Sequence, residues 1–442
     1  MSVTIAPSAT AKEINRSCAN KLLDKSLYTQ NKMSSYELIV PGKNNWLFRS
    51  QTDFEKNFAF DDDVIKSLQK LSSLLQSKGT TLVIAYPPTR GIVAHKNIAN
   101  KFLKKFEFDP IKATDNYRKL LKDLKNQNIH IVGVPNFDES DGFFRKKDQH
   151  WNAKGARKTA QNVANYIKEL PVYDALIKKQ YISTLKENYE FEGRFNDVTK
   201  AFCNLELSPE EDELFETVPI QASQSESDLF NDELHPEVTL IGTSNSKADS
   251  FNANFDGFLK EYLSTDISNR ALPGAGIRDP FLMYLLSEEY LQHPPKLIIW
   301  EIPSYYTMDK SVAGMLNQIS ASTHGHCSTT NTLVSSETSL KAEGFTTILD
   351  IGENSKIKTA PNYLSLKFSD PFYKKFSINY IFDDEKESTK GFRFKRTQKY
   401  QKDGIFFALL PERNDNLKRV EIKVPDKLVG NIVTTKICAP RK

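Results

Sequence analysis

Two segments far apart in the chain carry residue types that together suit nucleophilic chemistry. Asp148-Gln149-His150-Trp151 combines a carboxylate with an imidazole, and Gly242-Thr243-Ser244-Asn245-Ser246 offers a hydroxyl. A serine hydroxyl is a poor nucleophile at neutral pH, so it needs a base within hydrogen-bond reach and a carboxylate that orients the base. We predict serine-based acyl chemistry, with Ser244 as nucleophile, His150 as base and Asp148 as the group that orients His150.

The surroundings of Ser244 favour this role. An apolar strand over 238–241 precedes it and an amphipathic helix that includes 255–263 follows, so Ser244 is expected at the carboxyl end of a sheet, where open α/β folds place their sites. The helix N-terminus and nearby N–H groups would stabilise an oxyanion. Two alternatives remain open: Ser244 only caps that helix, or Ser246 is the nucleophile.

Asp148 and His150 precede a predicted helix over 152–170. Residues two apart in an extended segment face the same way, so the carboxylate of Asp148 is expected to reach Nδ1 of His150 while Nε2 points outward. The alternative is an aspartate that caps the helix, beside a surface histidine.

Strands and helices alternate along most of the chain. Apolar runs predict buried strands, and helical spacing predicts helices between them, which indicates a parallel sheet covered by helices: strands over 81–86, 129–134, 238–241 and 297–300, helices over 64–75, 117–124 and 152–170. We interpret the acidic, Ser-rich segment 171–236 as an irregular insertion. The Ser/Thr/Gly-rich segment 309–345 is interpreted as a connector.

The C-terminal part has a different period. Apolar residues alternate with polar ones, as in Leu364, Leu366 and Phe368, which predicts an antiparallel β-sandwich. We therefore divide the 442 residues into an α/β domain over 1–325 and a β-sandwich over 326–442. No apolar run approaches the roughly 18 residues of a membrane span, so we do not expect this protein to be an integral membrane protein.

The two parts differ in charge. Residues 351–442 hold 20 Lys and Arg against 11 Asp and Glu, net +9, whereas the remaining 350 residues carry net −5. A basic module predicts an anionic polymer as partner, such as a polyuronate, a nucleic acid or a lipid surface. Nucleic acid is not expected, because the aromatic residues of the module occupy inward strand positions and form no evident stacking platform.

Polar residues on two strands of the module form a predicted cationic stripe that would bind successive carboxylates of a polyuronate: Lys375, Ser377 and Asn379 on one strand, Arg393, Lys395, Thr397 and Lys399 nearby. The alternative is a solvated strand face that prevents aggregation. Arg90, just beyond the strand over 81–86, is a candidate to bind a carboxylate nearer Ser244.

Four cysteines lack a C-x-x-C motif and leave three pairings or free thiols open; we favour one disulfide in each domain, Cys18–Cys203 and Cys327–Cys438. His324-Gly325-His326-Cys327 has the residue types of a metal site but no evident fourth ligand, so we expect no metal. No phosphate-binding G-x-x-x-x-G-K-[ST] motif is present, so we expect no cofactor and an acyl donor delivered by another protein.

The motifs taken together resemble the AlgX family of alginate biosynthesis proteins over nearly the whole chain. The resemblance rests on the Asp148–Trp151 and Leu240–Ser246 segments, on 254–259, on Asn45-Trp46-Leu47-Phe48 and on Trp300-Glu301-Ile302-Pro303. It implies an SGNH hydrolase-like domain with the Asp-His pair before the serine, a C-terminal carbohydrate-binding module and two disulfides. One departure is Asn245, where we expect an aromatic residue.

The activity that the resemblance implies is O-acetylation of alginate or polymannuronate in the periplasm, through an acetyl-serine on Ser244, with a possible place in an exopolysaccharide export complex. The chain starts without an export signal, a second departure that is accounted for if this is the mature chain. Two alternatives remain: an acetylesterase acting on the same polymer, and a non-catalytic scaffold that binds polyuronate.

Overall fold

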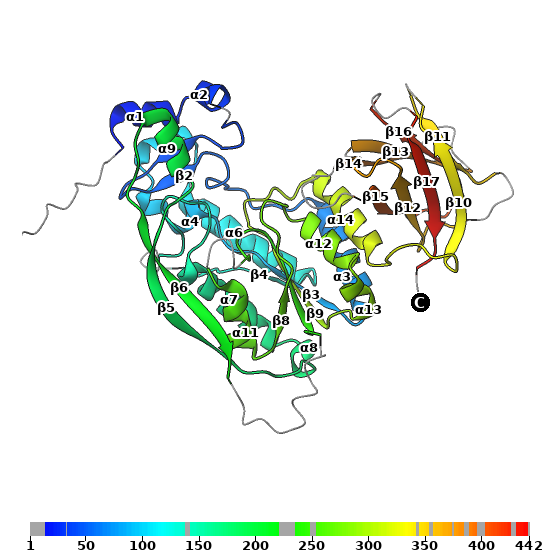
Figure 1. Ribbon diagram of the computed structural model, residues 1–442, viewed down its shortest axis with the longest axis horizontal. Helices are drawn as coiled ribbons and strands as arrows, with labels where there is room; N and C mark the ends of the chain where they lie inside the picture. Colours follow the sequence, from blue (N-terminus) through cyan, green and yellow to red (C-terminus); the bar gives the residue numbers. More distant parts are fainter. Residues whose placement is uncertain are drawn as a thin grey trace, which may run out of the picture.

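The computed structural model describes residues 14–31, 33–137, 142–220, 235–247, 253–341, 344–352, 357–373, 375–383, 403–425 and 430–440, and the backbone of 389–395. In this part of the chain, an α/β domain is followed by a β-sandwich (Figure 1). No helix among these residues is long and apolar enough to cross a membrane.

A five-stranded parallel sheet forms the centre of the α/β domain. Its strands lie in the order β4 (Ile131–Val132), β3 (Thr81–Ala85), β9 (Leu297–Glu301), β7 (Val238–Ile241), β8 (Ile267–Asn269). Every residue of β7 and β9 is buried, as expected for strands covered on both faces. The predicted helix-covered parallel sheet is confirmed, although β8 was not predicted.

Helices cover both faces of this sheet. On one side α7 (Ala153–Lys168) packs against α11 (Phe255–Leu263), and on the other lie α3 (Asp62–Gln76), α12 (Asp279–Leu285) and α14 (Lys310–Ser322) (Figure 1). Small residues such as Ala156 and Ala160 on the buried face of α7 allow close packing. The remaining elements of the α/β domain outside segment 171–236 are α1 (Arg16–Leu22), α2 (Lys25–Gln30), β1 (Ile39–Pro41), β2 (Leu47–Arg49), α4 (Arg90–Val93), a 3₁₀ turn (His95–Asn97), α5 (Asn100–Lys105), α6 (Pro110–Asn126) and α13 (Glu288–Gln292).

The segment 171–236 is more regular than expected. After α8 (Pro171–Asp174), the long strands β5 (Tyr181–Phe191) and β6 (Glu210–Pro219) form an antiparallel ribbon, with α9 (Asn196–Cys203) between them. Most side chains of β5 are exposed or half-buried, so apolar and polar residues do not alternate and the sequence gives no strand signal. Residues 221–234 lie outside the described part.

The predicted connector over 309–345 is likewise wrong in part, because it contains α14 and the strand β10 (Thr332–Ser339). Three polar residues, Gln318, Ser320 and Ser322, lie on the buried side of helix α14, so the sequence did not show the apolar face of a buried helix. Its C-terminal end and the start of β10 lie on either side of residue 326, where we placed the domain boundary.

Two four-stranded antiparallel sheets face each other in the C-terminal module, as predicted. One has the order β10, β17 (Ile432–Cys438), β12 (Tyr363–Phe368), β15 (Ile405–Leu409), and the other β11 (Thr346–Asp350), β16 (Leu417–Lys423), β13 (Lys375–Phe382), β14 (Thr389–Lys395). Alternate residues such as Leu364, Leu366 and Ile378 fill an apolar core between the sheets.

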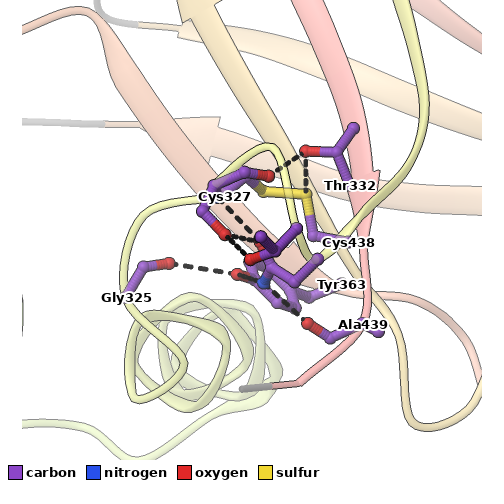
Figure 2. The surroundings of a disulfide bond; sticks show 9 residues. Gly325, Cys327, Thr332, Tyr363, Cys438 and Ala439 are labelled. Atoms are coloured by element: carbon purple, nitrogen blue, oxygen red, sulfur yellow. Dashed lines mark hydrogen bonds between the residues drawn. A yellow bond between two sulfur atoms is a disulfide. The ribbon is translucent and has the colours of Figure 1, made fainter.

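Both predicted disulfides are present. Cys18–Cys203 joins α1 to α9, and Cys327–Cys438 ties the chain that leaves α14 to the last strand, β17. Figure 2 shows the second one, beside which the hydroxyl of Tyr363 donates to the carbonyl oxygen of Gly325 at 3.2 Å. The disulfide and this hydrogen bond hold the sandwich against the end of the α/β domain.

Candidate active site

Ser244 lies in a tight turn just beyond the carboxyl end of β7. The N–H of Ser246 donates to the carbonyl oxygen of Thr243 at 3.2 Å, which closes the turn. A Cβ atom on Gly242 would stand 2.6 Å from Oγ of Ser246 and 2.9 Å from a carboxylate oxygen of Glu301. Glycine at 242 therefore lets the turn pack against the end of β9.

The three predicted residues meet at this turn. Nε2 of His150 lies 2.8 Å from Oγ of Ser244, and Nδ1 of His150 lies 2.5 Å from Oδ1 of Asp148. Asp148 is fully buried and His150 nearly so, whereas Ser244 is half-buried. The arrangement has the hydrogen-bond order of a nucleophile, a base and an orienting carboxylate.

The protonation states suit a general base. Burial alone would raise the pKa of Asp148, but its hydrogen bonds with His150 and with the N–H of Arg194 outweigh burial and lower that pKa to about 2. Burial lowers the pKa of His150 more than Asp148 raises it. At neutral pH the carboxylate is therefore charged and the imidazole neutral, as proton abstraction from a hydroxyl requires.

A backbone segment before α9 holds Asp148 in place. The N–H of Arg194 donates to Oδ2 of Asp148 at 3.0 Å, and the N–H of Phe195 donates to the carbonyl oxygen of Lys147 at 3.1 Å. A Cβ on Gly193 would stand 2.1 Å from that same carbonyl oxygen, so only glycine allows this close approach. The segment thus fixes the carboxylate from the side opposite His150.

A fully buried carboxylate, Glu301 at the end of β9, fixes the serine turn. It accepts hydrogen bonds from N–H and Oγ1 of Thr243 at 2.8 and 2.9 Å, from Nδ2 of Asn245 at 3.2 Å and from Oγ of Ser246 at 3.2 Å. Burial raises the pKa of Glu301, although these four bonds oppose the rise. Glu301 belongs to the Trp300–Pro303 motif, but its role was not predicted from the sequence, because its partners lie on the turn after another strand.

The Glu301 contacts also bear on Ser246 and Asn245. Ser246 is buried and its hydroxyl is bonded to Glu301, so the geometry favours Ser244 over Ser246 as nucleophile. Asn245, which stands where we expected an aromatic residue, faces Glu301 with its amide. Its carbonyl oxygen accepts from Nε1 of Trp151 at 3.0 Å, which ties the serine turn to the histidine segment.

The donors for an oxyanion differ from the expectation. Helix α11 begins only at Phe255, well beyond the serine turn, so its N-terminus does not directly follow Ser244 as predicted. The N–H of Asn245 is engaged by Oγ1 of Thr243 at 3.3 Å. The N–H of Ser244 has no hydrogen-bond partner among the described residues. It is therefore available to stabilise an oxyanion that forms next to Oγ of the same residue.

Arg90 has a structural position in place of the predicted substrate-binding one. Its side chain is buried, NH1 donates to Asp53 at 2.6 Å and to the carbonyl oxygen of Leu47 at 2.8 Å, and NH2 donates to the carbonyl oxygens of Arg145 and Lys146. These bonds leave neither terminal nitrogen for a substrate. Composition alone did not reveal the buried partner, Asp53.

A different cation, Arg49 on β2, lies closer to the site. It pairs with Asp53 at 2.7 Å, stacks over the ring of Tyr305 at 4.7 Å, and its charge is one of the causes that lower the pKa of His150. Arg49 was not predicted as a site residue, although it directly follows the Asn45–Phe48 motif.

The predicted cationic stripe is described only in part. On β13, Lys375 is exposed and Ser377 half-buried, but Asn379 is buried, contrary to a fully solvated face. The backbones of Arg393 and Lys395 lie in β14, paired with Ser377 and Lys375. Their side chains, and Thr397 and Lys399 entirely, lie outside the described residues.

The His324–Cys327 segment is not arranged as a metal site. The sulfur of Cys327 is bonded to Cys438, and the ring of His324 is buried against Tyr363 at 5.1 Å between centroids. Within the described part of the chain, no group of three or more potential ligands is close enough to hold a metal ion.

Comparison with known proteins shows the family of this chain. The family model of the SGNH hydrolase-like domain of the acetyltransferase AlgX matches residues 39–304. The chain belongs to this family. AlgX of Pseudomonas aeruginosa, an alginate biosynthesis protein, is 31% identical over 83% of this chain and 76% of its own length. The probable alginate O-acetylase AlgJ of the same organism is 27% identical over 61% of this chain and 70% of its own.

Membership also accounts for the whole architecture. The solved structure of Pseudomonas aeruginosa AlgX matches with a TM-score of 0.77 and 26% identity, over 97% of this chain and all of that one. The match therefore includes the β-sandwich as well as the α/β domain. The predicted SGNH hydrolase-like fold and the predicted family are both confirmed.

Proposed function

We propose that this protein transfers acetyl groups to hydroxyls of an anionic exopolysaccharide, alginate or polymannuronate, through an acetyl-serine on Ser244. The observation that carries the proposal is the 2.8 Å contact of His150 with Oγ of Ser244, backed by the charged Asp148. Family membership supports the acetyltransferase activity, and the names of its relatives support the polymer.

In the first step, Nε2 of His150 takes the proton of Ser244 while Oγ attacks the carbonyl carbon of an acetyl donor. The N–H of Ser244 stabilises the oxyanion, and the leaving group departs with the proton that His150 held. In the second step, a uronate hydroxyl attacks the acetyl-serine, and His150 removes its proton and returns it to Oγ of Ser244. Asp148 stabilises the imidazolium in both steps.

The setting follows from the same proposal. Two disulfides and relatives of the alginate pathway support an oxidising compartment, the periplasm, with the donor delivered by another protein of an exopolysaccharide export complex. The sandwich would act as a carbohydrate-binding module, with Lys375, Ser377 and Asn379, and the undescribed side chains of Arg393, Lys395, Thr397 and Lys399, as candidate contacts.

The test is acetyl transfer by the purified protein. It is incubated with an activated acetyl ester and oligomannuronate, and acetylated product is measured by mass spectrometry. Ser244→Ala is expected to lose about 10⁴-fold or more of the activity, as for other triad nucleophiles. Ser246→Ala is the matched control and is expected to keep most of it. Full activity in Ser244→Ala would contradict the mechanism.

Assays with bare and with acetylated polymer distinguish a transferase from an esterase. A transferase acetylates bare oligomannuronate in the presence of the donor. An acetylesterase releases acetate from acetylated polymer and leaves the bare polymer unchanged. If purified protein binds the polymer but Ser244 reacts with neither donor nor serine-directed inhibitor, the protein is a scaffold and the proposal is wrong.

A further inference from the structure

A pocket outside the triad lies against helix α7. It has a volume of about 250 Å³ and is lined by Phe137, Phe143, Lys154, Arg157, Lys158, Gln161 and Tyr262. Three of these residues are cations at positions three and four apart on α7, so their side chains emerge on one face of the helix. Among the described residues that line the pocket, three carry a positive charge and none carries a negative one.

Arg157 has no counter-ion among the residues that the structure describes. Its guanidinium stacks on the rings of Phe215 at 4.3 Å and Phe258 at 4.5 Å, and its Nε is buried without a hydrogen-bond partner. Among the described residues no carboxylate lies within ion-pair distance of it, whereas Lys154 has a distant partner, Glu213 at 3.8 Å. A pre-positioned, unpaired guanidinium is suited to bind a carboxylate.

Two aromatic rings, those of Phe143 and Tyr262, line the pocket beside the cations. Gly155 lies on the first turn of α7, where a Cβ would stand 2.2 Å from the carbonyl oxygen of Phe143 and 2.7 Å from its ring. Glycine therefore lets Phe143 lie directly against the helix. Tyr262 from α11 supplies a second ring, half-buried. Rings beside cations suit a ligand with an apolar face and a carboxylate, as a uronate unit has.

The helix that lines the pocket begins close to the triad along the chain. Asn152, the N-cap of α7, is two residues beyond His150, and Trp151 between them bonds to the serine turn. At a rise of about 1.5 Å per residue, Lys158 lies only about 9 Å along the helix from Asn152. A polymer with one unit at Ser244 is therefore long enough to place another unit in this pocket.

We propose that the pocket binds the carboxylate of one uronate unit of the acceptor polymer, next to the unit that is acetylated. This inference rests on the proposed function for its choice of ligand. It places a substrate subsite on the α/β domain itself, so the sandwich is not the sole anchor of the polymer. Lys154, Arg157 and Lys158 hold the carboxylate, and Phe143 and Tyr262 contact the sugar ring.

The test compares affinity for oligomannuronate between the full-length protein and the double variant Lys154→Gln/Lys158→Gln, by calorimetry at low salt. Removing two charges that face the ligand is expected to raise Kd about tenfold. Hydrolysis of a small acetyl ester such as p-nitrophenyl acetate, which has no uronate, is expected to stay unchanged. Arg157→Met, which keeps contact with Phe215 and Phe258, is expected to raise Kd similarly.

Lys168→Gln is the matched control, because Lys168 is an exposed lysine on the last turn of the same helix and does not line the pocket. Equal Kd for wild type, the double variant and Arg157→Met would overturn the inference. An equal loss of affinity for polyglutamate would also overturn it, since it would indicate a site for any polyanion. If wild type binds oligomannuronate in this pocket but transfers no acetyl group, the proposed function fails and the subsite stands.

Discussion

The α/β domain and the β-sandwich differ in what they bury. The α/β domain encloses charged or ionisable side chains, with Asp148, His150 and Glu301 at most 2% exposed. Among the described residues of the sandwich, the buried polar side chains are all uncharged: Thr346, Thr359, Asn379 and Thr435. Burying a charge is costly unless hydrogen bonds satisfy it, so buried charge indicates where the fold is organised for chemistry.

The two regions also differ in whether the role of a residue can be inferred from its own segment of the sequence. In the sandwich, neighbouring strands pair along their lengths and alternate residues fill the core. The alternation within one strand therefore shows which of its residues face the core. In the site, Ser244, His150 and Glu301 come from three separate segments. Nε2 of His150 contacts Oγ of Ser244, and Glu301 accepts from the N–H of Thr243, so the role of each depends on another segment. Perturbing the site should therefore affect reactivity, and perturbing the sandwich should affect stability or polymer affinity.

The largest effect is expected for Asp148→Asn. An amide in place of the carboxylate favours the wrong tautomer of His150 and no longer stabilises its charged form, so kcat/KM for acetyl transfer should fall by about 10⁴-fold. Asp197→Asn is the control, because Asp197 is an exposed aspartate on α9 bonded to Tyr36. A similar loss in both variants would show that the effect is structural.

Glu301→Gln should have the next largest effect. Its amide nitrogen must face at least one donor among Thr243, Asn245 and Ser246, which leaves that donor unsatisfied at a cost of roughly 1–3 kcal/mol. We expect kcat for acetyl transfer to fall about 10- to 100-fold while Kd for the polymer changes little. Unchanged kcat with normal thermal stability would show that Glu301 does not position the turn.

Asp148 and Glu301 also show what the sequence can and cannot predict. Asp148 and His150 are two apart in an extended segment, so their local geometry follows from spacing, and the parallel sheet follows from apolar runs such as 81–86. The role of Glu301 does not follow, because its four partners lie on the turn after β7. Arg90 was misjudged for the same reason, since its buried partner Asp53 is distant in sequence.

Polar surfaces explain the errors in secondary structure. The strands β5 and β6 are long and well paired, yet nearly all of their side chains are exposed or half-buried, so the alternation that identifies a strand with one buried face is missing. Helix α14 was hidden by serines on its buried side. In the sandwich, one face of strands such as β12 and β13 meets an apolar core, and there the period of two predicted the strands.

The pH dependence of acetyl transfer should report His150. Burial lowers the pKa of His150 below its ordinary value of 6.5, and the base works only when neutral. Activity should therefore persist as pH falls to 6.5 and decline below the lowered pKa, by about tenfold per pH unit. Asp148, with a pKa of about 2, stays charged throughout. Tryptophan fluorescence at each pH separates this loss from unfolding, and a decline that begins above pH 7 would contradict the assignment.

The two disulfides should have different effects on activity. Replacing either pair with serine should lower the free energy of unfolding by about 2–4 kcal/mol. Only loss of Cys18–Cys203 should also reduce hydrolysis of a small acetyl ester, about fivefold, because α9 directly follows the segment that holds Asp148. Loss of Cys327–Cys438 should leave that activity unchanged. Equal activity in both variants would mean that α9 does not support the carboxylate.

The smallest effect is expected on the sandwich. Lys375→Gln removes one exposed charge from β13, and a single solvated contact contributes about 0.2–1 kcal/mol, so Kd for oligomannuronate should rise only about two- to threefold. Lys367→Gln, an exposed lysine on β12 in the opposite sheet, is the control and should not change Kd. Because no charged side chain is buried among the described residues of the sandwich, neither variant should alter hydrolysis of a small ester. A large loss in Lys375→Gln would mean that the two regions share one site.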